Sequence, residues 1–271
     1  SRPSPDFGWG THVAAMDASA QNFGAVFLGA SPLLETGAAA WSNGRNALLV
    51  GLPISTSQSC LLGVYSVSLG QGPGGLSLDA DPLGSATVAG ATNGCTQVSV
   101  TAVAPIPGSG GALLAAHRVN PNGPAGNERQ VGLLMRLSAS GGLDFLRTEF
   151  PPFPTDDLRF RAVAADAQGR LLVAADITNS AGPSTRFGLF RYLANGAPDT
   201  SFNAGSAFIS TSFNAANGLE SPLATVRDLR VLGPRILLAG RSRWTGNTDD
   251  DFAIATFTTP DAPLFRDGFE P

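Results

Sequence analysis

The densest group of side chains that could do chemistry is acidic and lies near the C-terminal end of the sequence. Asn247 is followed by Asp249, Asp250 and Asp251, which offer several oxygens within a few residues. Hard cations such as Ca²⁺ prefer sets of carboxylate and carbonyl oxygens, so the three aspartates are candidate calcium ligands. The D-x-D-x-D-G spacing of known calcium loops is absent, however, and Asp251 directly precedes Phe252 in a strand-like run. The spacing therefore favours a solvated loop.

No other pattern in the sequence predicts catalysis or a cofactor. The two histidines, His12 and His117, lie in no metal-binding motif, and neither G-x-S-x-G nor H-E-x-x-H occurs. Nothing in the carboxylate spacing selects a facing pair of the kind that glycosidases use. Residues 70–75 have the letters G-x-G-x-x-G, but strand-like residues follow them, whereas a phosphate-binding loop leads into a helix. We therefore expect 70–75 to be a loop and both histidines to be structural.

The charged residues argue against nucleic acid as a partner. The net charge is −4 and no basic run occurs, so the phosphate backbone would meet no complementary surface. All 17 basic residues are arginines. Arg136 and Arg191 each lie a few residues before an aspartate, Asp144 and Asp199, which predicts one ion pair within each hairpin. The alternative is an exposed ring of arginines that binds anionic groups.

The elements that position these residues are short strands, seen most clearly at 162–208. Residues 171–175 form an apolar run that is too short for a helix and is bounded by turn-forming residues. Residues 187–193 form the next strand, and Asn195-Gly196 suits a tight turn. A further apolar piece at 207–209 completes four antiparallel strands, which is the composition of one β-propeller blade.

The strand recurs along the chain. The apolar triplet at 48–50 is repeated at 113–115, 171–173 and 237–239, a period near 60 residues that indicates a repeat array. We expect an all-β protein, a β-propeller of about four blades in a single domain at 1–259, with a C-terminal tail at 260–271. Five blades result if 22–34 forms a degenerate extra blade. Small residues at 38–40, 102, 104 and 162–165 suit inner strands that converge on a narrow axis.

The last copy of the repeat stops before a fourth strand, and the N-terminal segment resembles the missing piece. Its residues Asp6, Phe7, Trp9 and Val13 predict a strand that closes the last blade and removes two sheet edges. The cysteines, Cys60 and Cys95, fall at predicted strand ends where the loops of a propeller meet, so they predict a disulfide, with two free thiols as the alternative. No apolar run approaches the ~20 residues of a membrane-spanning helix.

The unit at 162–208 resembles the delta-60 repeat family of secreted and surface proteins of bacteria. The resemblance rests on GRLLVA at 169–174, RFGLFRY at 186–192 and NGAPDTSF at 195–202. The tail LFRDGFE at 264–270 resembles a short ending of exported gammaproteobacterial proteins. Both resemblances imply an exported protein, secreted or at the cell surface of a Gram-negative bacterium.

These expectations define three functions in order of preference. The first is a non-catalytic β-propeller that serves as a binding, adhesion or scaffold module for an extracellular ligand. The second is a self-assembling subunit of an extracellular filament or layer, formed by exchange of residues 6–13 between copies. The third is a secreted hydrolase, for which the sequence offers neither a nucleophile motif nor a carboxylate pair.

Overall fold

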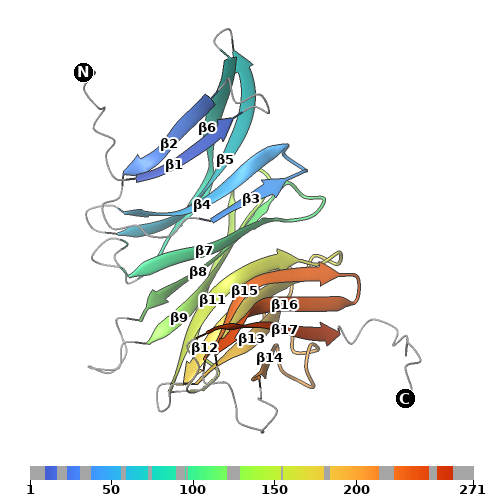
Figure 1. Cartoon of the computed structure of the whole chain (residues 1–271). Coiled ribbons are helices and arrows are strands. Elements are labelled where there is room, and N and C mark those ends of the chain that lie inside the picture. The colour runs from blue at the N-terminus through green and yellow to red at the C-terminus, as the bar shows by residue number, and fades with distance from the viewer. Residues whose placement is uncertain are drawn as a thin grey trace.

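The computed structural model of the chain consists of antiparallel β-sheets that follow one another along the sequence (Figure 1). The structure describes residues 10–16, 23–30, 38–55, 59–72, 75–89, 95, 97–120, 129–153, 155–179, 184–213, 223–243 and 249–258. Within these residues no helix is present that could span a membrane. The predicted all-β class is confirmed. The C-terminal tail at 260–271 and Asn247 lie outside the described residues.

Four of the sheets form a stack, and we call them the first, second, third and last sheet. The first sheet contains β3 (Ala38–Ser42), β4 (Ala47–Ser55), β5 (Cys60–Gly72) and β6 (Gly75–Thr87). The second contains β7 (Val98–Pro105), β8 (Ala112–Val119), β9 (Gln130–Leu137) and β10 (Leu143–Glu149). The third contains β11 (Asp156–Ala165), β12 (Leu171–Asn179), β13 (Thr185–Tyr192) and β14 (Phe208–Thr211). The last contains β15 (Leu223–Leu232), β16 (Arg235–Arg243) and β17 (Asp251–Thr258).

The core lies between the sheets, and this explains the continuous apolar runs in the sequence. Successive side chains of a strand point to opposite faces, so a strand packed on both faces needs apolar residues at every position. In β12, Leu171 and Val173 pack against the second sheet, whereas Leu172 and Ala174 pack against the last sheet. All four are fully buried.

The way the sheets stack shows that the predicted alignment of the repeats is wrong by one residue in the second and last sheets. Leu171 faces the preceding sheet, and the residues that do so in the second and last sheets are Ala112 and Ile236. The triplets predicted at 113 and 237 therefore each begin one residue too late. A one-residue slip moves a side chain to the other face of a strand. The sequence does not reveal the slip, because consecutive apolar residues occupy both faces.

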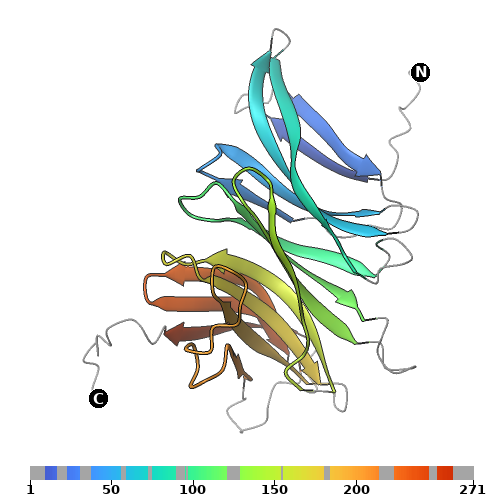
Figure 2. The same cartoon turned by 180° about the vertical axis from the view of Figure 1, so that it is seen from behind.

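The N-terminal strand does not close the last sheet as predicted. Residue Val13 lies in β1 (Gly10–Met16) and pairs with Val26 of β2 (Phe23–Ala30) in a separate two-stranded sheet. This hairpin lies beside β6, at the opposite end of the stack from β17 (Figures 1 and 2). Only a short connection separates β1 from β2, so their pairing orders less chain than closure with a strand more than 230 residues away. Asp6, Phe7 and Trp9 lie outside the described residues.

The described strands therefore form an open array. Residues 23–30 are a strand, as the alternative of a fifth blade required, but the described part of their sheet has two strands rather than four. The number of blades stays a prediction.

The predicted loop at 70–75 is also shorter than expected. β5 and β6 keep pairing up to Gly72 opposite Gly75, so only 73–74 separate the two strands. Backbone pairing needs no side chains, which lets glycine-rich residues continue a hairpin. As expected, a strand and not a helix follows the motif.

Candidate functional site

A cavity of about 670 Å³ lies where the first strands of the four stacked sheets run side by side. Its walls come from β3, β7, β11 and β15, each of which lies beside the next. Ligand-binding pockets typically have volumes of about 300–1,000 Å³. The cavity is therefore large enough for a small ligand.

Small side chains make room for this cavity, as the sequence predicts for inner strands. The alanines that line it are Ala38, Ala39, Ala40, Ala102, Ala104, Ala162, Ala164 and Ala165. Larger side chains at these positions would fill the space between strands that converge. The repeat thus preserves an open interior at its centre.

A β-bulge in three of the wall strands places one extra residue at the cavity wall in each. The pairing register shifts between Val100 and Ala102, between Phe160 and Ala162, and between Val226 and Asp228. The bulged residues, which pair with no residue of the second strand, are Thr101, Arg161 and Arg227, and all three line the cavity. Bulges commonly redirect side chains beside functional sites. Sequence reasoning missed these residues because a bulge leaves no clear pattern in the sequence.

One bulge residue connects neighbouring sheets directly, and a second does so through a buried aspartate. The Thr101 hydroxyl Oγ1 donates to the carbonyl of Phe160 at 2.7 Å. Arg161 Nε donates to Asp176 Oδ2 at 2.6 Å, and Asp176 Oδ1 accepts the Val226 amide at 2.8 Å. Burial raises the pKa of Asp176, and the charge of Arg161 opposes this shift. Arg161 is therefore fixed by a buried carboxylate that bridges the third and last sheets.

The third bulge residue, Arg227, differs because no sheet follows it in the described part of the chain. It is exposed and makes no ion pair with any described residue. Two residues on the same strand complete the charged wall: Asp228 and Arg230, joined by an exposed ion pair of 3.0 Å between Arg230 Nε and Asp228 Oδ2. Trp41 lines the cavity from β3 and is 47% exposed.

The candidate calcium ligands Asp249, Asp250 and Asp251 do not converge on one point, and Asp250 pairs with arginines. Asp250 is paired with both Arg241 and Arg243, the latter at 2.7 Å between Nε and Oδ1. The hydrogen bond from Arg243 is the main cause that keeps the pKa of Asp250 below its usual value. Asp249 and Asp251 are exposed, and Asp251 begins β17. Among the described residues, no three histidine, cysteine, aspartate or glutamate side chains gather as a metal site would require.

The two ion pairs predicted within hairpins are confirmed. Arg136 lies 2.9 Å from Asp144, and Arg191 lies 2.7 Å from Asp199, measured from Nε to Oδ2. Arg191 is fully buried. Burial disfavours the charge of Asp199, but the hydrogen bond from Ser201 and the charge of Arg191 outweigh it, so the pKa of Asp199 lies below its usual value. These arginines are therefore structural and do not form an anion-binding ring.

His117 lies within β8. It pairs with Ser99 and Gly132 and faces the third sheet, where the Phe160 ring packs over Gly132. Burial lowers its pKa from 6.5 to about 4, and the charges of Arg161 and Arg159 add to this shift. The neutral side chain is thus part of the interface between sheets. His12 lies in β1.

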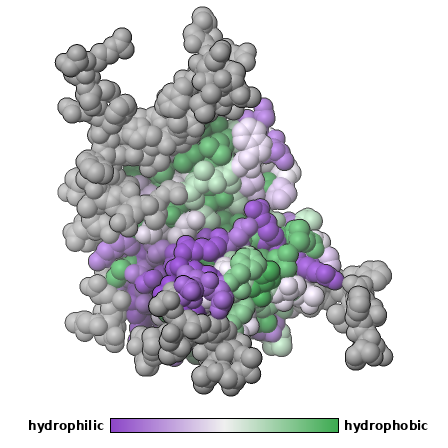
Figure 3. Space-filling view, in the orientation of Figure 1, coloured by the Kyte–Doolittle hydropathy of each residue, from purple (hydrophilic) through white to green (hydrophobic). Residues whose placement is uncertain are grey.

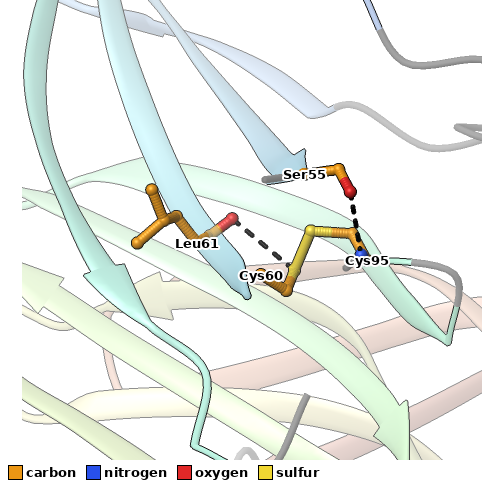
Figure 4. Close-up of a disulfide and its surroundings, with 4 residues drawn as sticks. All are labelled: Ser55, Cys60, Leu61 and Cys95. Atoms are coloured by element: carbon orange, nitrogen blue, oxygen red, sulfur yellow. Dashed lines mark hydrogen bonds between the residues drawn. A yellow bond between two sulfur atoms is a disulfide. The ribbon is translucent and has the colours of Figure 1, made fainter. Parts of the chain in front are cut away.

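The predicted disulfide between Cys60 and Cys95 is present (Figure 4). Cys60 is the first residue of β5, Cys95 lies shortly before β7, and their Cα atoms are 4.7 Å apart. The Cys95 amide donates to Ser55 Oγ at 3.3 Å, as Figure 4 shows. The bond therefore ties the first sheet to the start of the second.

Comparison with known proteins supports a β-propeller family for the best-matched repeat. Residues 168–202 match a family described as a domain of unknown function (DUF5122) β-propeller. This segment covers β12, β13 and the turn that carries Asp199. No curated protein matches the chain.

Proposed function

We propose that this protein is an exported β-propeller of the delta-60 type that binds a ligand in its axial cavity without catalysing a reaction. The observation that carries the proposal is the cavity itself, which is walled by the first strand of every stacked sheet. The wall strands β3, β7 and β11 contribute mostly small side chains, whereas the charged side chains come from the bulge of β11 and from β15. A scaffold of this kind presents a few chosen side chains to a ligand on rigid strands.

The state of the buried carboxylates supports binding rather than catalysis. The buried aspartates of the described chain are each paired with an arginine at 2.6–3.0 Å: Asp156 with Arg186, Asp166 with Arg170, Asp176 with Arg161, and Asp199 with Arg191. A general acid or base must reach its substrate and exchange a proton with it. Carboxylates saturated by guanidinium groups are better suited to holding strands in place.

The disulfide supports export. Disulfides persist in oxidising compartments and are rare in the reducing cytosol. The resemblance of 264–270 to the ending of exported proteins points the same way.

The test compares two substitutions of an exposed alanine by tryptophan in the whole, oxidised chain. Ala39→Trp places an indole in the cavity, and Ala167→Trp places one in an exposed turn that does not line the cavity. A panel of saccharides and peptides is screened against the native protein, and each hit is titrated against both variants. We expect Ala39→Trp to abolish binding and Ala167→Trp to retain it. Binding that survives Ala39→Trp, or a panel without hits, would overturn the proposal.

A second candidate function, self-association, is favoured by the last sheet. Its outer strand β17 has β16 as its only neighbour among the described strands. Phe252 is 75% exposed and Ile254 is 54% exposed on the face that no sheet covers. Figure 3 shows hydrophobic surface over this sheet, beside the hydrophilic middle of the molecule. Unpaired edges with apolar side chains are sites where chains associate.

Light scattering across a concentration series tests self-association. If the last sheet mediates it, Phe252→Lys should shift the protein to monomer, because the new charge cannot be buried in a contact. Phe150→Lys, which changes a phenylalanine that is 59% exposed after β10, should leave the assembly intact. A native protein that stays monomeric at every concentration would exclude this function.

A further inference from the structure

We propose that the ligand of the cavity is an acidic saccharide, with its carboxylate bound by Arg227 and Arg230 and its hydroxyl groups bound by Asp228. The inference rests on the proposed binding function and names the chemistry of the ligand.

The first argument is that β15 departs from the repeat at the positions that matter. We compare one position of the first strand across the four sheets, aligned by its pairing with the second strand. This position holds Ala38, Ala102 and Ala162 in the first three sheets, and Asp228 in the last. The position two residues later holds Ala40, Ala104 and Ala164 in the first three sheets, and Arg230 in the last. Alanine meets the packing needs of three sheets, so packing alone does not call for charges on the fourth. A charged pair at two positions that hold alanine in the other three sheets indicates a polar ligand.

The second argument is the sign of the charge. The lining includes three guanidinium groups and one carboxylate in a chain whose net charge is −4. Arg161 is already bound to Asp176, and Arg227 has no ion-pair partner among the described residues. The pair between Arg230 and Asp228 is exposed, and exposed pairs contribute little free energy. Arg230 can therefore exchange its partner for a ligand carboxylate at small cost, and a guanidinium binds a carboxylate in a two-point geometry.

The third argument selects a saccharide among carboxylate ligands. Trp41 of β3 pairs with Leu48 of β4, and Arg230 of β15 pairs with Leu237 of β16. In the aligned register of the sheets, Trp41 and Arg230 therefore differ by one residue position along the strand direction, and both line the cavity. The exposed indole offers a flat apolar surface, as ring-stacking sites do. A ring stacked on Trp41 thus lies in the same cavity as the charged wall.

The test measures binding of an oligogalacturonate of defined length to the whole, oxidised chain by calorimetry. Its methyl ester, of equal length and without charge, provides the matched ligand control. Arg227→Gln and Arg230→Gln remove the proposed carboxylate contacts, and Arg235→Gln removes an exposed arginine on β16 that does not line the cavity. We expect the acid to bind at least about tenfold more tightly than the ester, and each cavity substitution to remove about tenfold, because a hydrogen bond to a charged group commonly contributes that much. Arg235→Gln should leave the affinity unchanged.

Several results would overturn the inference while leaving the proposed function intact. Equal affinity for acid and ester would show that the carboxylate is not recognised. Tighter binding of a sulfated saccharide, or of a glutamate-rich peptide of the same length, would assign the cavity to a different anion. If Arg227→Gln lowers the thermal midpoint of the free protein but not the affinity of the folded protein, Arg227 supports the fold and does not contact the ligand.

One result would overturn both proposals. This is the case if Ala39→Trp fills the cavity and yet changes the binding of no ligand.

Discussion

Replacing His117 with glutamine should remove a specific part of the acid sensitivity of this protein. In the folded chain, burial between the second and third sheets lowers the pKa of His117 to about 4, helped by the charges of Arg161 and Arg159. An unfolded histidine titrates at 6.5. Between these two pH values the unfolded chain binds a proton that the folded chain does not. Folding stability must therefore fall as the pH is lowered through this window.

The magnitude follows from the width of the window. A difference of one pKa unit corresponds to about 1.4 kcal/mol, so the shift from 6.5 to about 4 corresponds to about 3 kcal/mol. The contribution is complete above pH 6.5, decreases as the pH falls, and is lost at about pH 4. It is a large fraction of the ~5–15 kcal/mol that stabilises a typical domain.

Urea unfolding of the oxidised protein, followed by circular dichroism from pH 7.5 to pH 3.5, measures this contribution. Aspartates such as Asp176, whose pKa is raised, also titrate in acid, but they do so in both proteins. The difference between native and His117→Gln chains should therefore shrink by about 3 kcal/mol as the pH falls from 7.5 to 4. Parallel curves for the native and His117→Gln proteins would refute the assignment of a buried neutral histidine.

Three further predictions concern stability. Joint replacement of Cys60 and Cys95 by serine should lower the free energy of unfolding by about 4 kcal/mol, since the bond closes a loop with a sequence separation of 35; urea titration with and without reductant checks this. Gly141→Ala should cost at least about 2 kcal/mol more than Gly108→Ala, because both have positive φ but only the Cβ at 141 would overlap a neighbouring carbonyl; thermal midpoints of both variants measure the difference. Arg191→Met should cost about 3–5 kcal/mol, since it leaves a buried aspartate unpaired, and addition of an aspartate-to-asparagine change at its partner should recover much of the loss in the same urea assay.

The sequence alone was sufficient for the features that local patterns encode. Short apolar runs between turn-forming residues identified the strands, because alternation and turn chemistry act within a few residues. The pairs of Arg136 with Asp144 and of Arg191 with Asp199 were predictable for the same reason, since each lies within one hairpin. The disulfide was predictable because both cysteines fall at predicted strand ends where the loops of a propeller meet.

The tertiary structure alone decided which face each strand turns to its neighbours and where the chain bulges. The consecutive leucines around position 113 fit both faces equally well, so only the stacking of sheets reveals the register. Val13 pairs with Val26 of the nearby strand β2 and not with the distant strand β17. Pairing with β2 closes a shorter loop and costs less chain entropy, and no sequence motif indicates this difference. Arg227 and Arg230 became candidates for ligand binding only when the structure placed them beside alanines more than 60 residues away in the chain. Local patterns specify elements, whereas a site at the meeting point of four sheets depends on how those elements pack together.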